Sequence, residues 1–208
     1  MSLPCVLIVQ PWFTAIGHPA QSVLNTARAL GIRPDVGYLI CDPGNGGLAE
    51  TASQLERYGS VERFTSRGNS LRTGTLLSLP AVLRVVRRDA ELQHVFYLDA
   101  DLISLAAGWP LAALSARRVR LVSSVYLGGP ERIASHTLAR ALVSRFLSSP
   151  GRRLFLRTDE LRQAWRDAFP KLPQDRIETI PSLELADSAD IPSRPHDSKE
   201  LRFGVVGQ

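Results

Sequence analysis

The sequence predicts an α/β protein with a doubly wound, Rossmann-like, mostly parallel sheet and helices on both faces. Two observations lead to this prediction. Short apolar runs rich in Val, Ile and Leu recur along the chain, as expected for strands that are buried on both faces. Stretches with helical periodicity separate these runs, and strands that alternate with helices are typical of right-handed crossovers in a parallel sheet.

The strands and helices follow from this alternation in chain order. The predicted strands span residues 5–10, 36–41, 61–64, 94–98, 120–125, 153–156 and 177–180. The predicted helices span residues 21–30, 48–58, 70–88, 102–115, 133–147 and 159–168. Gly31 is placed to end the first helix, and Thr158 is a good N-cap for the last. Pro80 lies inside the helix over 70–88 and predicts a break or kink there.

Composition limits the class of protein. The chain has 208 residues, 44% of them hydrophobic and 22% charged, which indicates a globular domain with a sizeable core. No apolar stretch is long enough to cross a bilayer, and the N-terminus lacks the pattern of an export signal, so we expect the protein in the cytoplasm. Cys5 and Cys41 fall in predicted buried strands, where a free thiol acts as a small hydrophobe.

Charge is the second compositional signal. The net charge is +5, and Lys171 and Lys199 are the only lysines among the 25 basic residues. Arginine clusters at 84–88, 117–120 and 152–153 suit phosphate oxygens, which predicts reversible contact with an anionic membrane surface. The alternative is that these arginines lie on solvated helix faces.

The end of the chain predicts a domain boundary. A stretch rich in Pro, Ser and Asp precedes the apolar run LRFGVVGQ at 201–208. We interpret residues 1–181 as one Rossmann-like domain, 182–200 as an interdomain linker, and 201–208 as the first strand of a second domain. The alternative is that residues 201–206 add an edge strand to the first sheet.

Ligands of open parallel sheets gather at the carboxyl ends of the strands, which directs attention to the loops at 11–20, 42–47, 99–101 and 126–131. In the first loop, Gly17 with His18 beside it could let a diphosphate approach the N-terminus of the following helix. The loop carries neither the Gly-x-Gly-x-x-Gly fingerprint nor a phosphate loop with lysine. A structural turn explains the same glycine.

Two acidic residues follow the strand at 94–98. An Asp99-x-Asp101 pair after an apolar strand is a pattern that can hold Mg²⁺ or Mn²⁺ against a diphosphate, because these cations prefer oxygen ligands. The alternative is that Asp101 caps the helix that begins at residue 102. Tyr126 ends the next strand, where its phenol could donate a hydrogen bond to a substrate or could simply be a packed aromatic.

Taken together, the chain resembles the N-terminal domain of GT-B fold glycosyltransferases of the retaining family 4 type. The segments that carry this resemblance are VLIVQPW at 6–12 with Gly17 and the helix over 21–30, LFLRTDELRQAW at 154–165, RIETIPS at 176–182, and LRFGVVGQ at 201–208. The family commonly has a histidine where this chain has Tyr126, and its glycine loop often has two glycines.

The resemblance implies the acceptor-binding half of an enzyme that transfers a sugar from a nucleotide-sugar donor to a glycan or lipid-linked acceptor, at the inner face of a bacterial membrane. Gly17 then contacts the donor diphosphate, His18, Asp99 and Asp101 contact the acceptor, and Tyr126 occupies the catalytic position. No metal, no resident cofactor and no nucleic-acid partner is expected, and these residues alone should be inactive. The alternatives are a metal-dependent GT-A type transferase that uses Asp99 and Asp101, and a non-catalytic sugar- or phosphate-binding module.

Overall fold

The computed structural model describes residues 5–13, 18–44, 48–66, 70–115, 119–126 and 128–180, without the side chains of residues 18 and 113–115. Its centre is a sheet of seven strands in the order β3-β2-β1-β4-β5-β6-β7, and every neighbouring pair is parallel. The strands are β1 (Val6–Gln10), β2 (Val36–Asp42), β3 (Ser60–Thr65), β4 (His94–Tyr97), β5 (Leu121–Tyr126), β6 (Arg152–Leu156) and β7 (Ile177–Thr179). The predicted Rossmann-like α/β class is confirmed, and each predicted strand exists to within two residues at either end.

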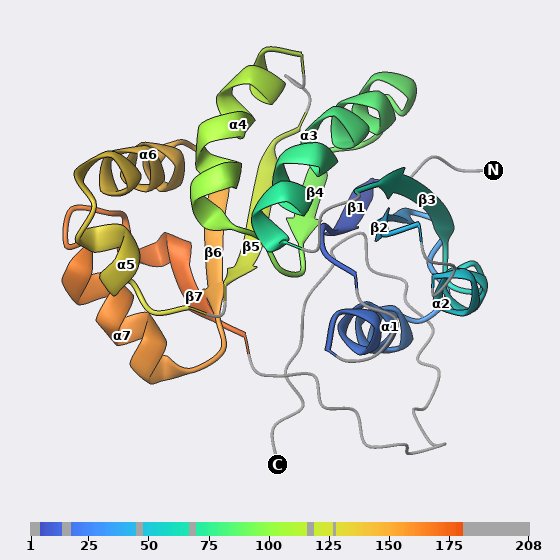
Figure 1. The fold of residues 1–208 in the computed structure, drawn as a ribbon, viewed down its shortest axis with the longest axis horizontal. Helices are drawn as coiled ribbons and strands as arrows, with labels where there is room; N and C mark the ends of the chain where they lie inside the picture. Colours follow the sequence, from blue (N-terminus) through green and yellow to red (C-terminus); the bar gives the residue numbers. More distant parts are fainter. Residues whose placement is uncertain are drawn as a thin grey trace.

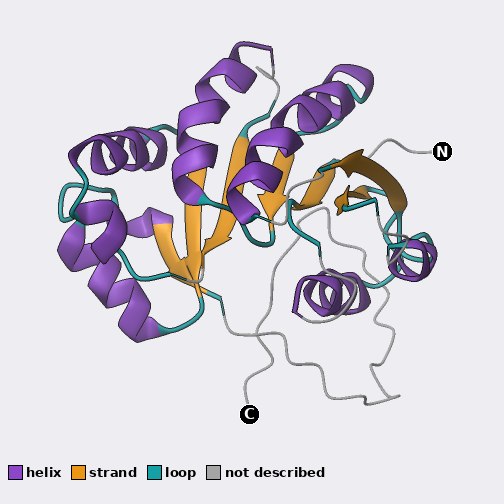
Figure 2. Cartoon of the chain, viewed as in Figure 1, coloured by secondary structure: helices purple, strands orange, loops and turns teal. Residues whose placement is uncertain are grey.

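Helices cover both faces of the sheet (Figures 1 and 2). They are α1 (His18–Leu30), α2 (Ala49–Leu55), α3 (Leu71–Arg88), α4 (Leu102–Ser115), α5 (Glu131–Ala134), α6 (Thr137–Ser148) and α7 (Asp159–Ala168), with a short 3₁₀ helix at Gln174–Arg176 before β7. Helices α3 and α4 pack side by side on one face, whereas α1 lies against the other. The central strands are therefore shielded twice, which explains why β1 is buried along its whole length.

Two helix predictions need correction. Helix α3 runs without a break through Pro80, because the ring lies on the exposed side, where the carbonyl that loses its N–H partner can be hydrated. The predicted helix over 133–147 is two helices, since the backbone at His136 is extended. The Ser135 hydroxyl donates to the carbonyl of Arg132 at the end of α5.

The predicted helix ends are confirmed. Gly31 follows α1 with a φ of 69°, a left-handed conformation that favours glycine, and its N–H donates to the carbonyl of Ala27. Thr158 precedes α7, and its side-chain oxygen accepts a hydrogen bond from the N–H of Leu161 at 3.2 Å. Capping residues in the sequence therefore predict these two helix ends correctly.

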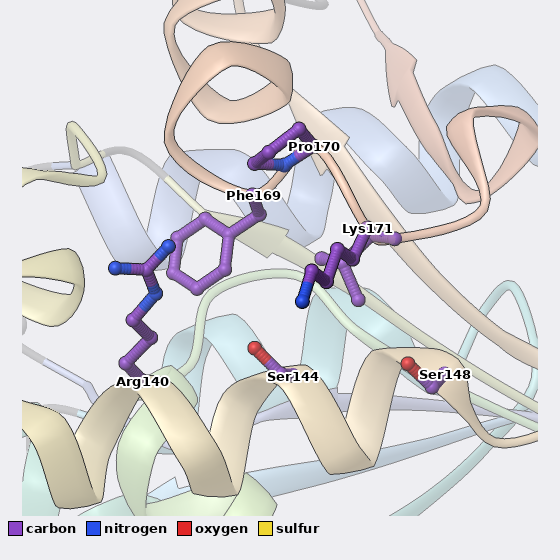
Figure 3. Close-up of a pocket in the computed structure, with 7 residues that line it drawn as sticks. Arg140, Ser144, Ser148, Phe169, Pro170 and Lys171 are labelled. Atoms are coloured by element: carbon purple, nitrogen blue, oxygen red, sulfur yellow. The ribbon is translucent and has the colours of Figure 1, made fainter.

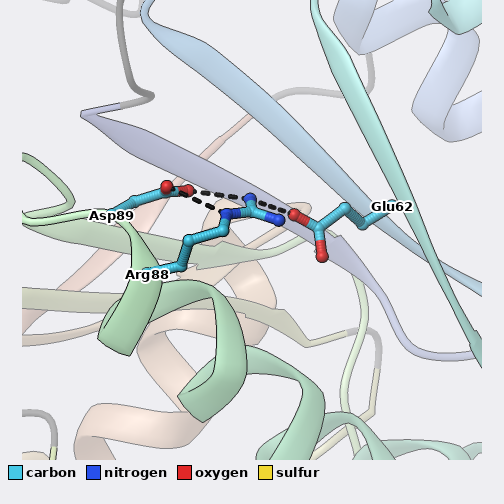
Figure 4. Close-up of polar contacts among 3 residues, drawn as sticks. All are labelled: Glu62, Arg88 and Asp89. Atoms are coloured by element: carbon cyan, nitrogen blue, oxygen red, sulfur yellow. Dashed lines mark hydrogen bonds and ion pairs between the residues drawn. The ribbon is translucent and has the colours of Figure 1, made fainter.

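A cluster of charged side chains ties the edge strand β3 to the end of α3 (Figure 4). The guanidinium of Arg88 forms an ion pair with Asp89 at 3.0 Å and a second one with Glu62 on β3. The Asp89 side chain is fully buried, so its charge depends on this cation for compensation. Both partners raise the pKa of Arg88, so its guanidinium keeps its positive charge.

The predicted linker over 182–200 and the predicted strand over 201–208 lie outside the described residues, so the domain division stays a prediction. Within the described ranges, no helix combines the length and apolarity needed to span a bilayer. Both cysteines are free thiols; Cys41 is buried, and burial raises its pKa to about 11.

Candidate functional site

The strand order places a candidate site at the carboxyl edge of the sheet between β1 and β4. The chain runs outward from β1 through β2 to β3, and then returns to the other side of β1 at β4. Loops therefore leave β1 and β4 in opposite directions, and in sheets of this order ligands bind in the crevice at that point. The groups at this edge come from the ends of β1, β2, β4, β5 and β6.

The end of β1 carries two buried polar atoms for which the described part of the chain offers no hydrogen-bond partner. The Gln10 side chain is 1% exposed, and its Nε2 donates to the carbonyl of Trp12 at 2.9 Å. Among the described residues, neither Gln10 Oε1 nor Trp12 Nε1 has a hydrogen-bond partner. Such atoms cost free energy unless something satisfies them, so the end of β1 holds an acceptor and a donor whose hydrogen-bonding capacity the described residues leave unused.

The first turn of α3 fixes the backbone that carries these groups. A Cβ on Gly74 would lie 1.9 Å from the carbonyl oxygen of Pro11, so only glycine allows α3 to approach this closely. The next residue, Thr75, has a hydroxyl that accepts a hydrogen bond from the N–H of Asp101 at 3.0 Å. One helix turn therefore holds the loops after β1 and β4 in a fixed relation.

Asp42 ends β2, one strand away from the crevice. Its Oδ1 accepts a hydrogen bond from the N–H of Gly44 at 2.8 Å, and Gly44 takes a φ of 78°. This turn fixes one carboxylate oxygen, while the other carries no hydrogen bond to a described residue. The carboxylate thus keeps acceptor capacity at the carboxyl edge.

The two acidic residues after β4 have different roles. Asp101 Oδ1 accepts a hydrogen bond from the N–H of Ser104 at 2.8 Å, which is the N-cap that the alternative interpretation describes. Asp99 is half-buried, and this burial raises the pKa of its carboxyl to about 6, although the charge of Arg157 acts in the opposite direction. Asp99 therefore exchanges a proton near neutral pH, a property common to functional carboxyls.

Tyr126 closes the β5 side of the edge. Its ring packs edge-on against Trp165 with centroids 5.6 Å apart, and Gly128 lies against the phenol. Trp165 in turn donates from Nε1 to the Gly128 carbonyl at 3.1 Å. Burial, followed by the charge of Asp101, raises the pKa of Tyr126, so the phenol stays protonated and can donate. Tyr126 is therefore a packed aromatic, and its role as a donor to a substrate stays a prediction.

The remaining predicted site residues are only partly covered. Gly17 lies outside the described residues. His18 begins α1, but its side chain is not among those described. No group of three His, Cys, Asp or Glu side chains in the described part of the chain could hold a metal ion.

Sequence reasoning missed Gln10, Trp12 and Arg157. Gln10 lies within an apolar run, and only the pairing of β1 between β2 and β4 makes its burial costly. Asp42 falls in the loop at 42–47 that the sequence already indicates, and its position directly after the second strand is the signal that identifies it.

Neither a protein-family model nor a curated protein sequence matches the chain. Solved structures similar to it include a short-chain dehydrogenase from Mycobacterium smegmatis, 15% identical, with 89% of this chain and 94% of that one covered at a TM-score of 0.42. The oxidoreductase yciK from E. coli is 11% identical, with 85% of each chain covered at a TM-score of 0.41. RhlG from Pseudomonas aeruginosa, in an active-site complex with NADP, is 11% identical, with 86% and 96% covered at a TM-score of 0.40.

The predicted membership of the GT-B glycosyltransferases was therefore wrong, because the structural neighbours are short-chain dehydrogenases and oxidoreductases. The same correction applies to the predicted sugar transfer, to the nucleotide-sugar, acceptor and membrane partners, and to the GT-A and non-catalytic alternatives. The segments behind the resemblance are a strand, a loop and a helix in sequence. These features belong to any doubly wound sheet, and a fold of this kind supports many functions. At these low identities, the neighbours' activities are not transferred to this chain.

Proposed function

We propose that the chain is a nucleotide-binding domain of an oxidoreductase, with a nicotinamide dinucleotide bound across the carboxyl edge between β1 and β4. The observation that carries this proposal is the reversal of strand order at β1 and β4, with an acidic residue at the end of β2. That combination is typical of dinucleotide-binding folds, in which an acidic residue at this position accepts hydrogen bonds from the ribose.

The residues present fit such a ligand in two further respects. Asp42 has a carboxylate oxygen available for a ribose hydroxyl. Gln10 Oε1 and Trp12 Nε1, both buried, supply an acceptor and a donor beside the crevice. The Gly-x-Gly-x-x-Gly fingerprint is missing, and we propose that Gly17 alone provides the close approach of the diphosphate to the start of α1.

The proposed ligand supplies hydride transfer, and the chain supplies proton control. Asp99 lies at the end of β4 with a pKa of about 6, so its carboxyl can hold or release a proton toward a substrate oxygen near neutral pH. Tyr126 is kept protonated by burial and serves as a donor to the same substrate. Arg157 attracts the ionised form of Asp99 and limits how far its pKa rises.

Asp42 also predicts which dinucleotide is preferred. A carboxylate at this position favours the free 2′-hydroxyl of NAD and repels the 2′-phosphate of NADP. We propose cytoplasmic residence as well, where such dinucleotides are used and where Cys5 and Cys41 remain as the free thiols that the structure contains.

Calorimetric titration of the 208-residue chain with NAD, NADP and ADP-ribose tests the proposal. We expect NAD to bind at least about tenfold more tightly than NADP, a difference of about 1.4 kcal/mol. Asp42→Asn should remove most of this preference by weakening NAD, whereas Glu50→Gln, an exposed carboxylate on α2, should leave it unchanged. Absence of saturable binding by all three ligands would overturn the proposal.

A further inference from the structure

Apart from the candidate site at the carboxyl edge, a pocket lies on the outer surface between α6 and the segment 169–172 that follows α7 (Figure 3). Its volume is about 330 Å³, enough for a small organic molecule. Both polar and apolar side chains line it, among them Arg140, Ser144, Ser148, Phe169, Lys171 and Leu172. None of the lining residues is acidic.

Two cations reach this pocket from different elements. Arg140 comes from α6 and Lys171 from the segment after α7, and Figure 3 shows both side chains directed into the space between those elements. Neither cation forms an ion pair with a residue in the described ranges, unlike Arg88 and Arg153, which face carboxylates. The pocket therefore concentrates positive charge that the chain itself leaves uncompensated.

The Arg140 side chain is exposed, but two contacts limit its movement. One Nη donates to the carbonyl of Ala168 at 3.3 Å, and the guanidinium lies 5.9 Å from the centroid of the Phe169 ring. A guanidinium fixed in this way loses less conformational entropy when it binds an anion. Its other N–H groups make no hydrogen bond to a described residue and remain available as donors.

The same face of α6 adds hydroxyl donors. Ser144 and Ser148 follow Arg140 at intervals of four residues, so all three lie in one row along the helix. Figure 3 shows this row facing Lys171 across the pocket. Two cations and two hydroxyls around one space are the donor set that suits a phosphoryl or carboxylate group.

The remaining wall is apolar and rigid. Phe169 is 3% exposed and stacks on Trp165, with ring centroids 5.1 Å apart and an interplanar angle of 14°. Leu172 is buried beside it. A ligand with an apolar portion next to its anionic group would bury that portion here at little cost in side-chain ordering.

We infer that this pocket binds a small organic phosphate, with its phosphoryl group between Arg140 and Lys171 and its apolar portion against Phe169 and Leu172. This site is separate from the carboxyl edge of the sheet and does not depend on the function proposed for that edge. The ligand class follows from the charge and the wall together: the cations select a dianion, and the apolar wall selects an organic ester over the inorganic ion.

Calorimetric titration of the full chain at low salt with phenyl phosphate and with inorganic phosphate tests this inference. We expect phenyl phosphate to bind in the millimolar range or below, and more tightly than inorganic phosphate. Lys171→Met should weaken phenyl phosphate by about tenfold, since an uncompensated cation in contact with the phosphoryl group is lost. Lys171→Arg should keep most of the affinity. Arg145→Met, an exposed cation on α6 outside the pocket, is the matched control and should change nothing.

Both Arg140 and Lys171 have exposed side chains, so the double variant Arg140→Met/Lys171→Met should stay folded, which circular dichroism verifies. It should abolish measurable binding of phenyl phosphate. Binding by the double variant within twofold of the unmodified chain, or no saturable binding by the unmodified chain, overturns the inference. Undiminished binding of phenyl phosphate by Lys171→Met would place the ligand away from this pocket, and would also overturn the inference.

Discussion

The two ends of β4 place buried titratable groups in different surroundings. At the amino end, His94 Nε2 lies 3.0 Å from Ser123 Oγ, and its ring packs edge-on against Phe96. At the carboxyl end, Asp99 lies in the loop that follows β4, and its carboxyl is half-buried. Burial favours the neutral form in both cases, lowering the pKa of His94 to about 4 and raising the pKa of Asp99 to about 6.

The difference shows which polar groups serve the fold and which are available for a ligand. Near the amino end of β4, His94 is paired with Ser123 and Asp89 with Arg88. At the carboxyl edge, Gln10 Oε1 and Trp12 Nε1 have none among the described residues. Substitutions at the amino end should therefore change stability alone, whereas substitutions at the carboxyl edge should also change binding.

The largest expected effect is at His94. The folded chain resists protonation of this ring, so the unfolded chain binds more protons between pH 6.5 and about 4, and stability falls as the pH drops through that window. The loss should reach roughly 3 kcal/mol, from the linkage of about 1.4 kcal/mol per pH unit. His94→Gln should remove most of this decrease in the free energy of unfolding when urea unfolding is measured between pH 6.5 and pH 4. His136→Gln replaces an exposed histidine before α6 and is the control; the decrease in stability should remain in this variant.

Asp99 predicts a pH effect of opposite sign and slightly smaller size. The folded chain binds the carboxyl proton more strongly than the unfolded chain, so its contribution is present below pH 3.8 and is lost as the pH rises to about 6. The change is again roughly 3 kcal/mol. Asp99→Asn should be more stable than the unmodified chain at pH 7 and should lose this pH dependence.

Urea unfolding at pH 4 and pH 7 checks the Asp99 prediction, with the exposed Asp175→Asn as control. Under the proposed function, Asp99→Asn should also keep dinucleotide binding while it lowers turnover of a reducible substrate. Equal stability of Asp99→Asn and the unmodified chain at pH 7 would contradict the burial argument.

The third effect is at Arg88. Replacement by Met leaves the buried carboxylate of Asp89 without its cation and removes the link to Glu62 on β3. We expect a loss of about 2 kcal/mol, less than for a fully buried pair because the Arg88 side chain is 60% exposed. Chemical unfolding measures this loss, and Arg84→Met, an exposed residue on the same helix, should cost much less. A change in dinucleotide affinity of the folded Arg88→Met chain would break the distinction between the two ends.

The sequence predicted the order of strands and helices well, because β-branched apolar runs and helical periodicity are local signals. It predicted Gly31 and Thr158 as helix ends for the same reason. It failed at His136, where an extended residue divides one helical pattern into two helices. It also assigned the wrong family, from segments that any doubly wound sheet contains. Gln10 and Trp12 could not be identified, since their importance depends on a strand pairing that joins residues far apart in the chain.

The central claim is that the carboxyl edge between β1 and β4 holds a dinucleotide. A crystal structure of the chain grown with NAD tests this most directly. We predict the ligand across the ends of β1 and β4, with a ribose hydroxyl within hydrogen-bond distance of Asp42 and a polar contact to Gln10 or Trp12. NAD bound elsewhere on the molecule, or bound at this edge without contact to any of these residues, would contradict the claim.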